Sequence, residues 1–174
     1  MKKFFAVMLA MLTLLLSGCG EASEYEYILT EKSFFLVMTH VQYYPAEYVG
    51  KNFEYDCFTY ELTDVDGKSY VCGVRKCSAG YGCTCGKDTI IGFILNYDGE
   101  IPAPKNQSAD NNDKTWVHLK GKVESSEFIN IRVYAYNGDE VDYSVVETVP
   151  LLTYNVETIN IIEDYSSLNY YVTK

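Results

Sequence analysis

The sequence is poor in basic residues and in histidine. It holds 14 lysines and arginines against 24 aspartates and glutamates, which gives a formal net charge of −10, and its only histidines are His40 and His118. A protein that binds nucleic acid needs a basic surface to neutralise phosphates, so we expect no nucleic-acid partner. Two histidines also leave few candidates for a general base, and His118 lies on a predicted strand, where a surface role is commoner than a catalytic one.

The motifs of the common enzyme classes are missing as well. The chain has no Gly-x-Ser-x-Gly, no His-Glu-x-x-His and no phosphate-binding loop. Nothing in the sequence pairs a base with a cysteine that would act as a nucleophile. Asp64-Val-Asp-Gly67 resembles the start of a calcium loop, but position 75, where that loop needs an acid, is arginine. We therefore interpret it as a hairpin turn and predict a binding or accessory protein, not an enzyme.

The one long apolar run is too short for a stable membrane span. Met1-Lys-Lys is a positive n-region, and residues 4–16 form an apolar h-region. Leu16-Ser-Gly-Cys19 follows and resembles a bacterial lipobox, which implies removal of residues 1–18 and a lipid on Cys19. The alternative is an ordinary secretory signal with Cys19 merely nearby. We expect an extracytoplasmic protein that is anchored to the bacterial cell membrane by this N-terminal lipid.

Removal of the signal peptide would leave 156 of the 174 residues, which suits one domain with a hydrophobic core. Two lysines would be removed with it, so the net charge would become −12. Such an acidic chain is not attracted to anionic lipid headgroups. We divide the mature chain into a lipidated tether over residues 19–29, a domain over 30–163, and a polar tail over 164–174. The tail is expected to be loosely ordered.

The domain is predicted to be mainly β, with one short N-terminal helix. Phe34, Val37, Met38 and Val41 form a helical stripe that Thr30 would cap. Strand patterns then follow, with a loop over residues 98–114, a hairpin turn at Asn137-Gly138 and a chain break at Pro150; the strands cover residues 52–63, 69–75, 89–97, 116–123, 128–136, 141–146 and 152–162. Such a succession favours a small closed or partly open β-barrel.

Three strings, in this order, point to a known family. They are Tyr44-Pro-Ala-Glu-Tyr-Val-Gly-Lys51, the cysteine-rich stretch with Ile91-Gly-Phe-Ile-Leu95 after it, and Trp116-Val-His-Leu-Lys-Gly-Lys122. Over residues 34–163 the chain resembles the extracytoplasmic domain of bacterial permease subunits of unknown function and their free-standing lipoprotein relatives. The resemblance implies an OB-like barrel, an envelope partner such as a permease, and a loose link to transition-metal handling. Those relatives usually carry adjacent cysteines, which are split here as Cys83-Thr-Cys85.

Four of the six cysteines fall within fourteen residues of a glycine-rich stretch. These are Cys72, Cys77, Cys83 and Cys85. With Cys19 set aside, Cys57 makes five, and an odd number cannot all pair within one chain.

Three interpretations of the cysteine stretch remain open. The first is two disulfides, for instance Cys72–Cys85 and Cys77–Cys83, in a structural or interaction module at the cell surface. The second is a four-thiolate zinc site in a metal-handling protein, and the third is free thiols that act in redox chemistry or transient metal handling. In each case we expect the four sulfurs to lie close together at one end of the barrel, with Cys57 apart.

Overall fold

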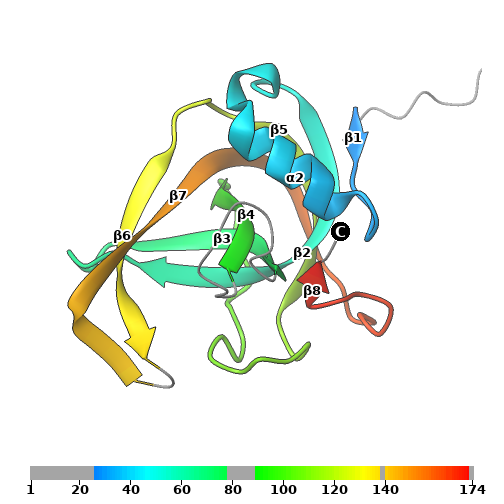
Figure 1. The fold of residues 1–174 in the computed structure, drawn as a ribbon. Coiled ribbons are helices and arrows are strands. Elements are labelled where there is room, and N and C mark those ends of the chain that lie inside the picture. The colour runs from blue at the N-terminus through cyan, green and yellow to red at the C-terminus, as the bar shows by residue number, and fades with distance from the viewer. Residues whose placement is uncertain (1–25, 78–88, 138–139, 173–174) are drawn as a thin grey trace, which may run out of the picture.

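The structure is a computed structural model that describes residues 26–77, 89–137 and 140–172. It is mainly β with one α-helix, as the sequence predicted. The predicted signal peptide, Cys19, Cys83 and Cys85 lie outside the described residues. The elements in chain order (Figure 1) are β1 (Tyr27–Ile28), α2 (Phe34–Tyr43), the 3-10 turn η1 (Pro45–Glu47), β2 (Asn52–Thr63), β3 (Ser69–Cys77), β4 (Thr89–Asn96), β5 (Trp116–Val123), β6 (Ile129–Asn137), β7 (Glu140–Ile161) and β8 (Tyr171–Val172).

Five strands pair in a closed cycle. β2 pairs antiparallel with both β3 and β5, and β5 pairs antiparallel with β7. β7 runs parallel to β4, which pairs antiparallel with β3 and so returns to β2. β1 pairs with β2 and β8 pairs with β3, both in parallel. Among the strands of the described residues, β6 pairs only with β7, and Figure 1 shows this hairpin, the β6–β7 arm, projecting from the body of the molecule.

Two hydrophobic clusters lie on opposite faces of these strands. The inner core takes side chains from all five strands of the cycle and from α2: Phe34, Met38, Val41, Phe53, Tyr55, Cys57, Cys77, Ile91, Phe93, Leu95, Val117, Leu119, Val123, Leu152, Tyr154 and Val156. The outer core lies under the base of the arm: Phe58, Leu62, Cys72, Val74, Ile94, Trp116, Ile131 and Leu151. β2 serves both, since its odd positions face the inner core and its later even positions face the outer one.

The helix forms as its apolar stripe predicted, but its cap was misplaced. Phe34, Met38 and Val41 are buried against the inner core. Thr30 does not cap the helix, because Ser33 occupies the N-cap position and makes no side-chain cap hydrogen bond. The Ser33 hydroxyl instead accepts the backbone N–H of Thr30 at 2.8 Å. The two residues thus form a turn ahead of the helix, and the helix begins three residues later than a Thr30 cap would place it.

Pro150 does not break the chain, contrary to the sequence prediction. It lies inside β7, a single strand of 22 residues. β7 pairs with β6 as far as Leu151, with β4 over residues 152–155 and with β5 over residues 154–161, so its partner changes one residue after the proline. Proline lacks an N–H and is tolerated where a strand has no neighbour on that side. It therefore marks the point at which β7 passes from the arm into the closed cycle.

The C-terminal residues are ordered as far as residue 172, although their polar composition predicted a loose tail. Tyr165, Leu168 and Tyr170 pack against the outer core. Val172 is buried in the inner core, and β8 pairs with the end of β3. The tail therefore completes both cores. Trp116 is fully buried, and its ring stacks on that of Tyr165 in the tail.

The backbones of β5 and β7 approach each other closely at Gly121. A register shift separates Lys120 from Gly121 in this pair. A Cβ atom on Gly121 would stand 2.1 Å from the backbone oxygen of Asn155. Only glycine allows the two backbones to approach in this way.

Candidate functional site

The structure separates two of the four predicted site cysteines. Cys72 and Cys77 both lie on β3, and because their positions differ by five, an odd number, their side chains point to opposite faces of the strand. Cys72 lies in the outer core, while Cys77 and Cys57 lie in the inner core. The prediction that the four sulfurs lie close together is therefore wrong for Cys72 and Cys77. Cys83 and Cys85 lie outside the described residues.

Burial makes the thiols of Cys57 and Cys72 poor nucleophiles and poor ligands. Both side chains are fully buried, and neither is in a disulfide. Desolvation raises the pKa of the Cys72 thiol to about 12 and raises that of Cys57 further. The thiolate is the form that attacks electrophiles and binds metals, so both groups are inert at neutral pH. Among the described residues, no group of three or more histidine, cysteine or acidic side chains could hold a metal ion.

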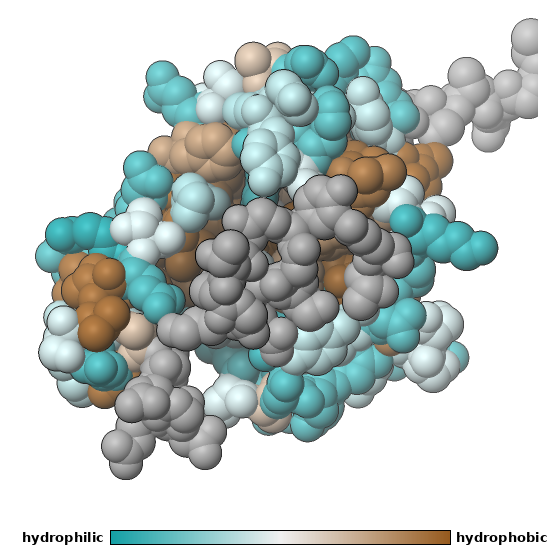
Figure 2. Space-filling view, viewed as in Figure 1, coloured by the Kyte–Doolittle hydropathy of each residue, from teal (hydrophilic) through white to brown (hydrophobic). Residues whose placement is uncertain are grey.

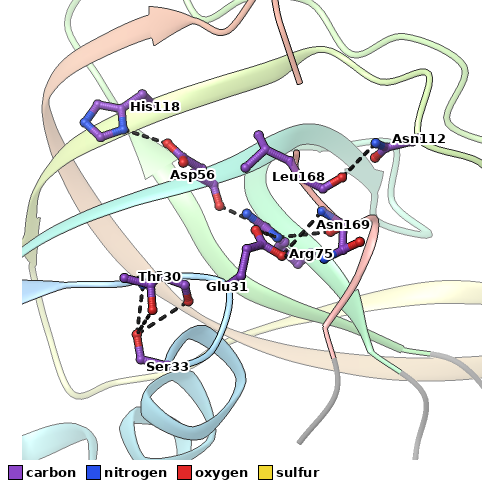
Figure 3. A network of polar contacts seen from close by, with 9 residues as sticks. All are labelled: Thr30, Glu31, Ser33, Asp56, Arg75, Asn112, His118, Leu168 and Asn169. Atoms are coloured by element: carbon purple, nitrogen blue, oxygen red, sulfur yellow. Dashed lines mark hydrogen bonds and ion pairs between the residues drawn. The ribbon is translucent and has the colours of Figure 1, made fainter. Parts of the chain in front are cut away.

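The most extensive polar network is built around Arg75 on β3, which sequence reasoning did not single out (Figure 3). Its side chain is almost completely buried. Nε donates to the backbone oxygen of Asp56 at 3.0 Å, and Nη1 donates to that of Asn169 at 3.0 Å. Nη1 also forms an ion pair with Glu31, just before α2. Arg75 thus ties β3 to β2, to the segment before the helix and to the C-terminal tail.

The guanidinium of Arg75 also lies between two aromatic rings. It stands 5.2 Å from the ring centre of Phe34 and 4.9 Å from that of Trp116. Asn169 closes the network, because its backbone N–H and side-chain amide both donate to Glu31. A buried charge is stable only when its donors are satisfied, and here carbonyls, a carboxylate and two ring faces share that role.

His118 lies on the outward face of β5, where two acidic residues of β2 flank it. Nδ1 is 2.6 Å from a carboxylate oxygen of Asp56, which lies directly opposite, and Nε2 is 3.1 Å from Glu54. Glu54 also pairs with Lys120 at 3.0 Å. A neutral imidazole can donate from one nitrogen only, so both contacts are hydrogen bonds when the ring carries two protons. The cluster joins β2 to β5 by opposite charges across the strand pair.

The long loop over residues 98–114 is held down by two lysines. Lys76 of β3 pairs with Asp110 at 2.8 Å, and Tyr171 donates to the same carboxylate. Lys114 is buried, donates to backbone oxygens of the loop and lies 5.1 Å from the ring centre of Tyr170. Burial lowers the pKa of Lys114. Because Tyr170 and Tyr171 belong to the tail, the loop and the tail fix each other.

The β6–β7 arm presents apolar side chains at a bulge. Tyr134 pairs with Val146, but the next residue of β6 pairs with Asp142, so residues 143–145 of β7 have no counterpart. Tyr143 is 74% exposed, and Val145 and Val146 are about half exposed. The ring of Tyr143 packs edge-on against that of Tyr134, with 5.0 Å between centroids.

Local hydrogen bonds shape this bulge. The backbone N–H of Ser144 donates to the Asp142 carboxylate at 2.9 Å, and the Ser144 hydroxyl donates to the same oxygen. These bonds lower the pKa of Asp142, so the carboxylate that holds the turn stays charged at neutral pH. Bulges commonly re-aim a side chain away from a regular ladder. Tyr143 is thus presented at a position that the sequence alternation alone did not reveal.

Comparison with known proteins gives one match. The model of the DUF1980 C-terminal domain, a domain of unknown function, matches residues 20–136, about two thirds of the chain. The matched span begins directly after Cys19 and includes Arg75, His118 and the cysteine-rich stretch. It is consistent with the resemblance to an uncharacterised, permease-associated domain. No curated protein and no solved structure matches the chain.

Proposed function

This chain belongs to the DUF1980 C-terminal domain family, and we propose that it is a lipid-anchored, extracytoplasmic accessory protein that binds an envelope protein through its β6–β7 arm. The single observation that carries the binding role is the arm, because it presents Tyr143 and its neighbours on a bulge that extends from the folded body (Figure 1).

The lipid anchor rests on the order of signals at the N-terminus. A positive n-region, an apolar h-region and Leu16-Ser-Gly-Cys19 follow one another at the spacing of a lipoprotein signal. Cys19→Ala should leave an unprocessed precursor or a soluble exported form. If that variant is cleaved and held in the membrane fraction as the unaltered protein is, the lipid anchor is excluded.

The scaffold is an OB-like barrel. The closed cycle of β2, β3, β4, β7 and β5 around an aromatic-rich inner core supports this assignment. α2 covers part of the same core, as a helix between strands does in small barrels. The arm is the element that extends beyond this scaffold (Figure 1).

The arm binds by side chains rather than by strand addition. No strand among the described residues pairs with β7 on its second edge over residues 141–149, but the bulge at Tyr143 interrupts that edge. Tyrosine is a common interface anchor because it buries a large ring at little entropic cost. A second copy of this chain would bring together two molecules that each carry a net charge of −12 once residues 1–18 are removed, and these repel each other. We therefore assign the arm to a different protein, such as the permease that the resemblance implies.

The described geometry gives less support to metal handling by all four cysteines. Cys72 and Cys77 lie in different cores, so they cannot bind one ion without unfolding of β3. Zinc content after acid release and intact mass before and after reduction address Cys77, Cys83 and Cys85 directly. Stoichiometric zinc would restore the metal-handling hypothesis.

A photo-crosslinking experiment tests the binding role of the arm. A photoreactive benzoylphenylalanine replaces Tyr143 in the full chain, expressed in a cell that makes the protein naturally. We expect one dominant protein adduct, which Val145→Asp should reduce because it places a charge beside the anchor. The matched control carries the same probe in place of Tyr43, also an exposed tyrosine. No protein adduct at position 143, or the same adduct at position 43, would refute the proposal.

A further inference from the structure

A second group of exposed apolar side chains lies at the N-terminal end of the described chain. Of the nine large hydrophobic residues exposed among the described residues, five fall within residues 28–49: Ile28, Leu36, Tyr43, Tyr44 and Val49. Figure 2 shows hydrophobic surface beside β1 and the start of α2. Single exposed apolar residues need no explanation, but a concentration in one short segment does.

The helix α2 carries two apolar stripes, and only one of them is covered. Phe34, Met38 and Val41 face the inner core. Leu36 and Tyr43 are seven residues apart and so share the opposite face, where they are 72% and 64% exposed. Tyr44 follows directly and is also exposed, and His40 lies between them on the same face. We call Leu36, His40, Tyr43 and Tyr44 the outer stripe.

The composition of the outer stripe fits a membrane interface better than bulk water or a dry protein contact. Tyrosine is enriched where a bilayer meets water, because its ring is apolar and its hydroxyl is polar. His40 accepts or donates a hydrogen bond with Tyr48 at 2.7 Å, so its polar edge has a partner within the chain. Exposed charges nearby are balanced, with Lys32 before the helix and Glu47 after it. Contact with lipid would thus depend on apolar burial rather than on headgroup charge.

The chain length between the proposed lipid and the described residues holds this end close to a bilayer. Glu26 comes seven positions after Cys19, and a fully extended chain spans at most about 25 Å over seven residues. β1 begins at the next residue, and α2 follows after five more. Of the elements described, β1 and α2 are therefore the first that an anchored molecule brings to the membrane.

We propose that the outer stripe of α2 rests on the phospholipid surface and so fixes the orientation of the anchored protein. This inference rests on the proposed lipid anchor and adds an orientation to it. Figure 1 shows the β6–β7 arm on the far side of the molecule from β1 and α2. An orientation with α2 on the membrane therefore turns the arm outward, toward a partner that extends from the bilayer.

The two matched tyrosine positions test the orientation. The full chain carries the benzoylphenylalanine probe at position 43 or at position 143, and membranes are illuminated in cells. Phospholipid adducts are then read by the mass of the peptide that carries the probe. We expect about tenfold more lipid adduct at position 43, because burial of one large apolar side chain shifts a contact equilibrium by at least that factor. Equal lipid adducts at the two positions would overturn the proposal.

Two further variants test the orientation separately from the lipid anchor. Leu36→Glu should reduce the lipid adduct at position 43 by a similar factor while the protein stays in the membrane fraction, and Ile161→Glu, at an exposed apolar position at the end of β7, should leave it unchanged. A protein that stays membrane-bound without a lipid adduct at position 43 refutes the orientation alone. A protein absent from the membrane fraction refutes both the anchor and the orientation. A protein adduct at position 43 would assign the stripe to a protein partner and contradict the lipid assignment.

Discussion

Replacing Arg75 by methionine tests whether its polar network holds the fold together. Methionine has a similar length and is apolar, so the change removes the guanidinium with little loss of volume. Two hydrogen bonds to the buried backbone oxygens of Asp56 and Asn169 are lost. Each bond from a charged donor contributes about 1.5–3 kcal/mol. The ion pair with Glu31 adds less, because that carboxylate is about one third exposed and water screens it.

The regained apolar burial and the relieved desolvation of the charge offset part of this loss. We therefore expect Arg75→Met to lower the free energy of unfolding by about 3 kcal/mol, measured by urea denaturation of residues 20–174. Hydrogen exchange should also show faster amide exchange over residues 165–172, because the tail loses its bond at Asn169. The neighbouring Lys76→Met is the control, since it removes a partly exposed ion pair with an exposed carboxylate. If the two variants lose the same stability, the network around Arg75 does not hold the fold.

Four other outcomes follow from single positions. Trp116→Ala should lower the free energy of unfolding by about 3–5 kcal/mol, with a smaller loss for Trp116→Phe, and a change within experimental error would contradict its burial. Gly121→Ala should prevent a stable fold because of its contact with a backbone oxygen, whereas Gly50→Ala, with open space but a φ of +76°, should cost about 1–2 kcal/mol. Cys72 should resist iodoacetamide at pH 8 until urea unfolds the protein; rapid labelling of the native protein would show that its thiol is accessible. Hydrogen bonds from the N–H groups of residues 66 and 132 lower the pKa of Asp64, so its contribution to stability is complete above about pH 4 and is lost as the pH falls through its lowered value. Asp64→Asn should accordingly lose less stability than the unaltered protein between pH 7 and pH 3.

Local signals predicted the strands whose faces differ clearly. β2 and β5 begin and end at the residues that the sequence predicted. Alternating polarity marks the two faces of these strands, and strong turn residues mark their ends. The turn at Asp64–Gly67 also formed as predicted, with Gly67 at a φ of +84°. In these segments the side chains that set the pattern are also the ones that the fold buries.

Long-range contacts explain most of what the sequence did not reveal. Pro150 suggests a break only if both edges of its strand are paired, and alternation cannot show which edges are free. The tail looks polar because its tyrosines carry hydroxyls, yet their rings cover the outer core. Arg75 is a charged residue in a strand pattern, and its partners come from residues 31, 56 and 169. No local window contains them together.

The cysteine-rich stretch shows a limit of counting residues along a chain. Four cysteines within fourteen residues suggested one cluster of sulfurs. An odd spacing on a strand, however, places Cys72 and Cys77 on opposite faces, and each joins a different core. The parity of their spacing was visible in the sequence and would have separated them once residues 69–77 were accepted as a single strand.

The last described strand sets a condition on when the molecule can fold. β8 pairs with the end of β3, where Val172 lies opposite Cys77, 95 positions earlier in the chain, and Val172 is buried in the inner core. A polypeptide that leaves a ribosome or crosses a membrane with its N-terminus first therefore lacks part of its interior until residue 172 has emerged. Until then Arg75 also lacks its acceptor on Asn169. Synthesis from the N-terminus thus leaves the interior of the domain incomplete until its last described residues have emerged.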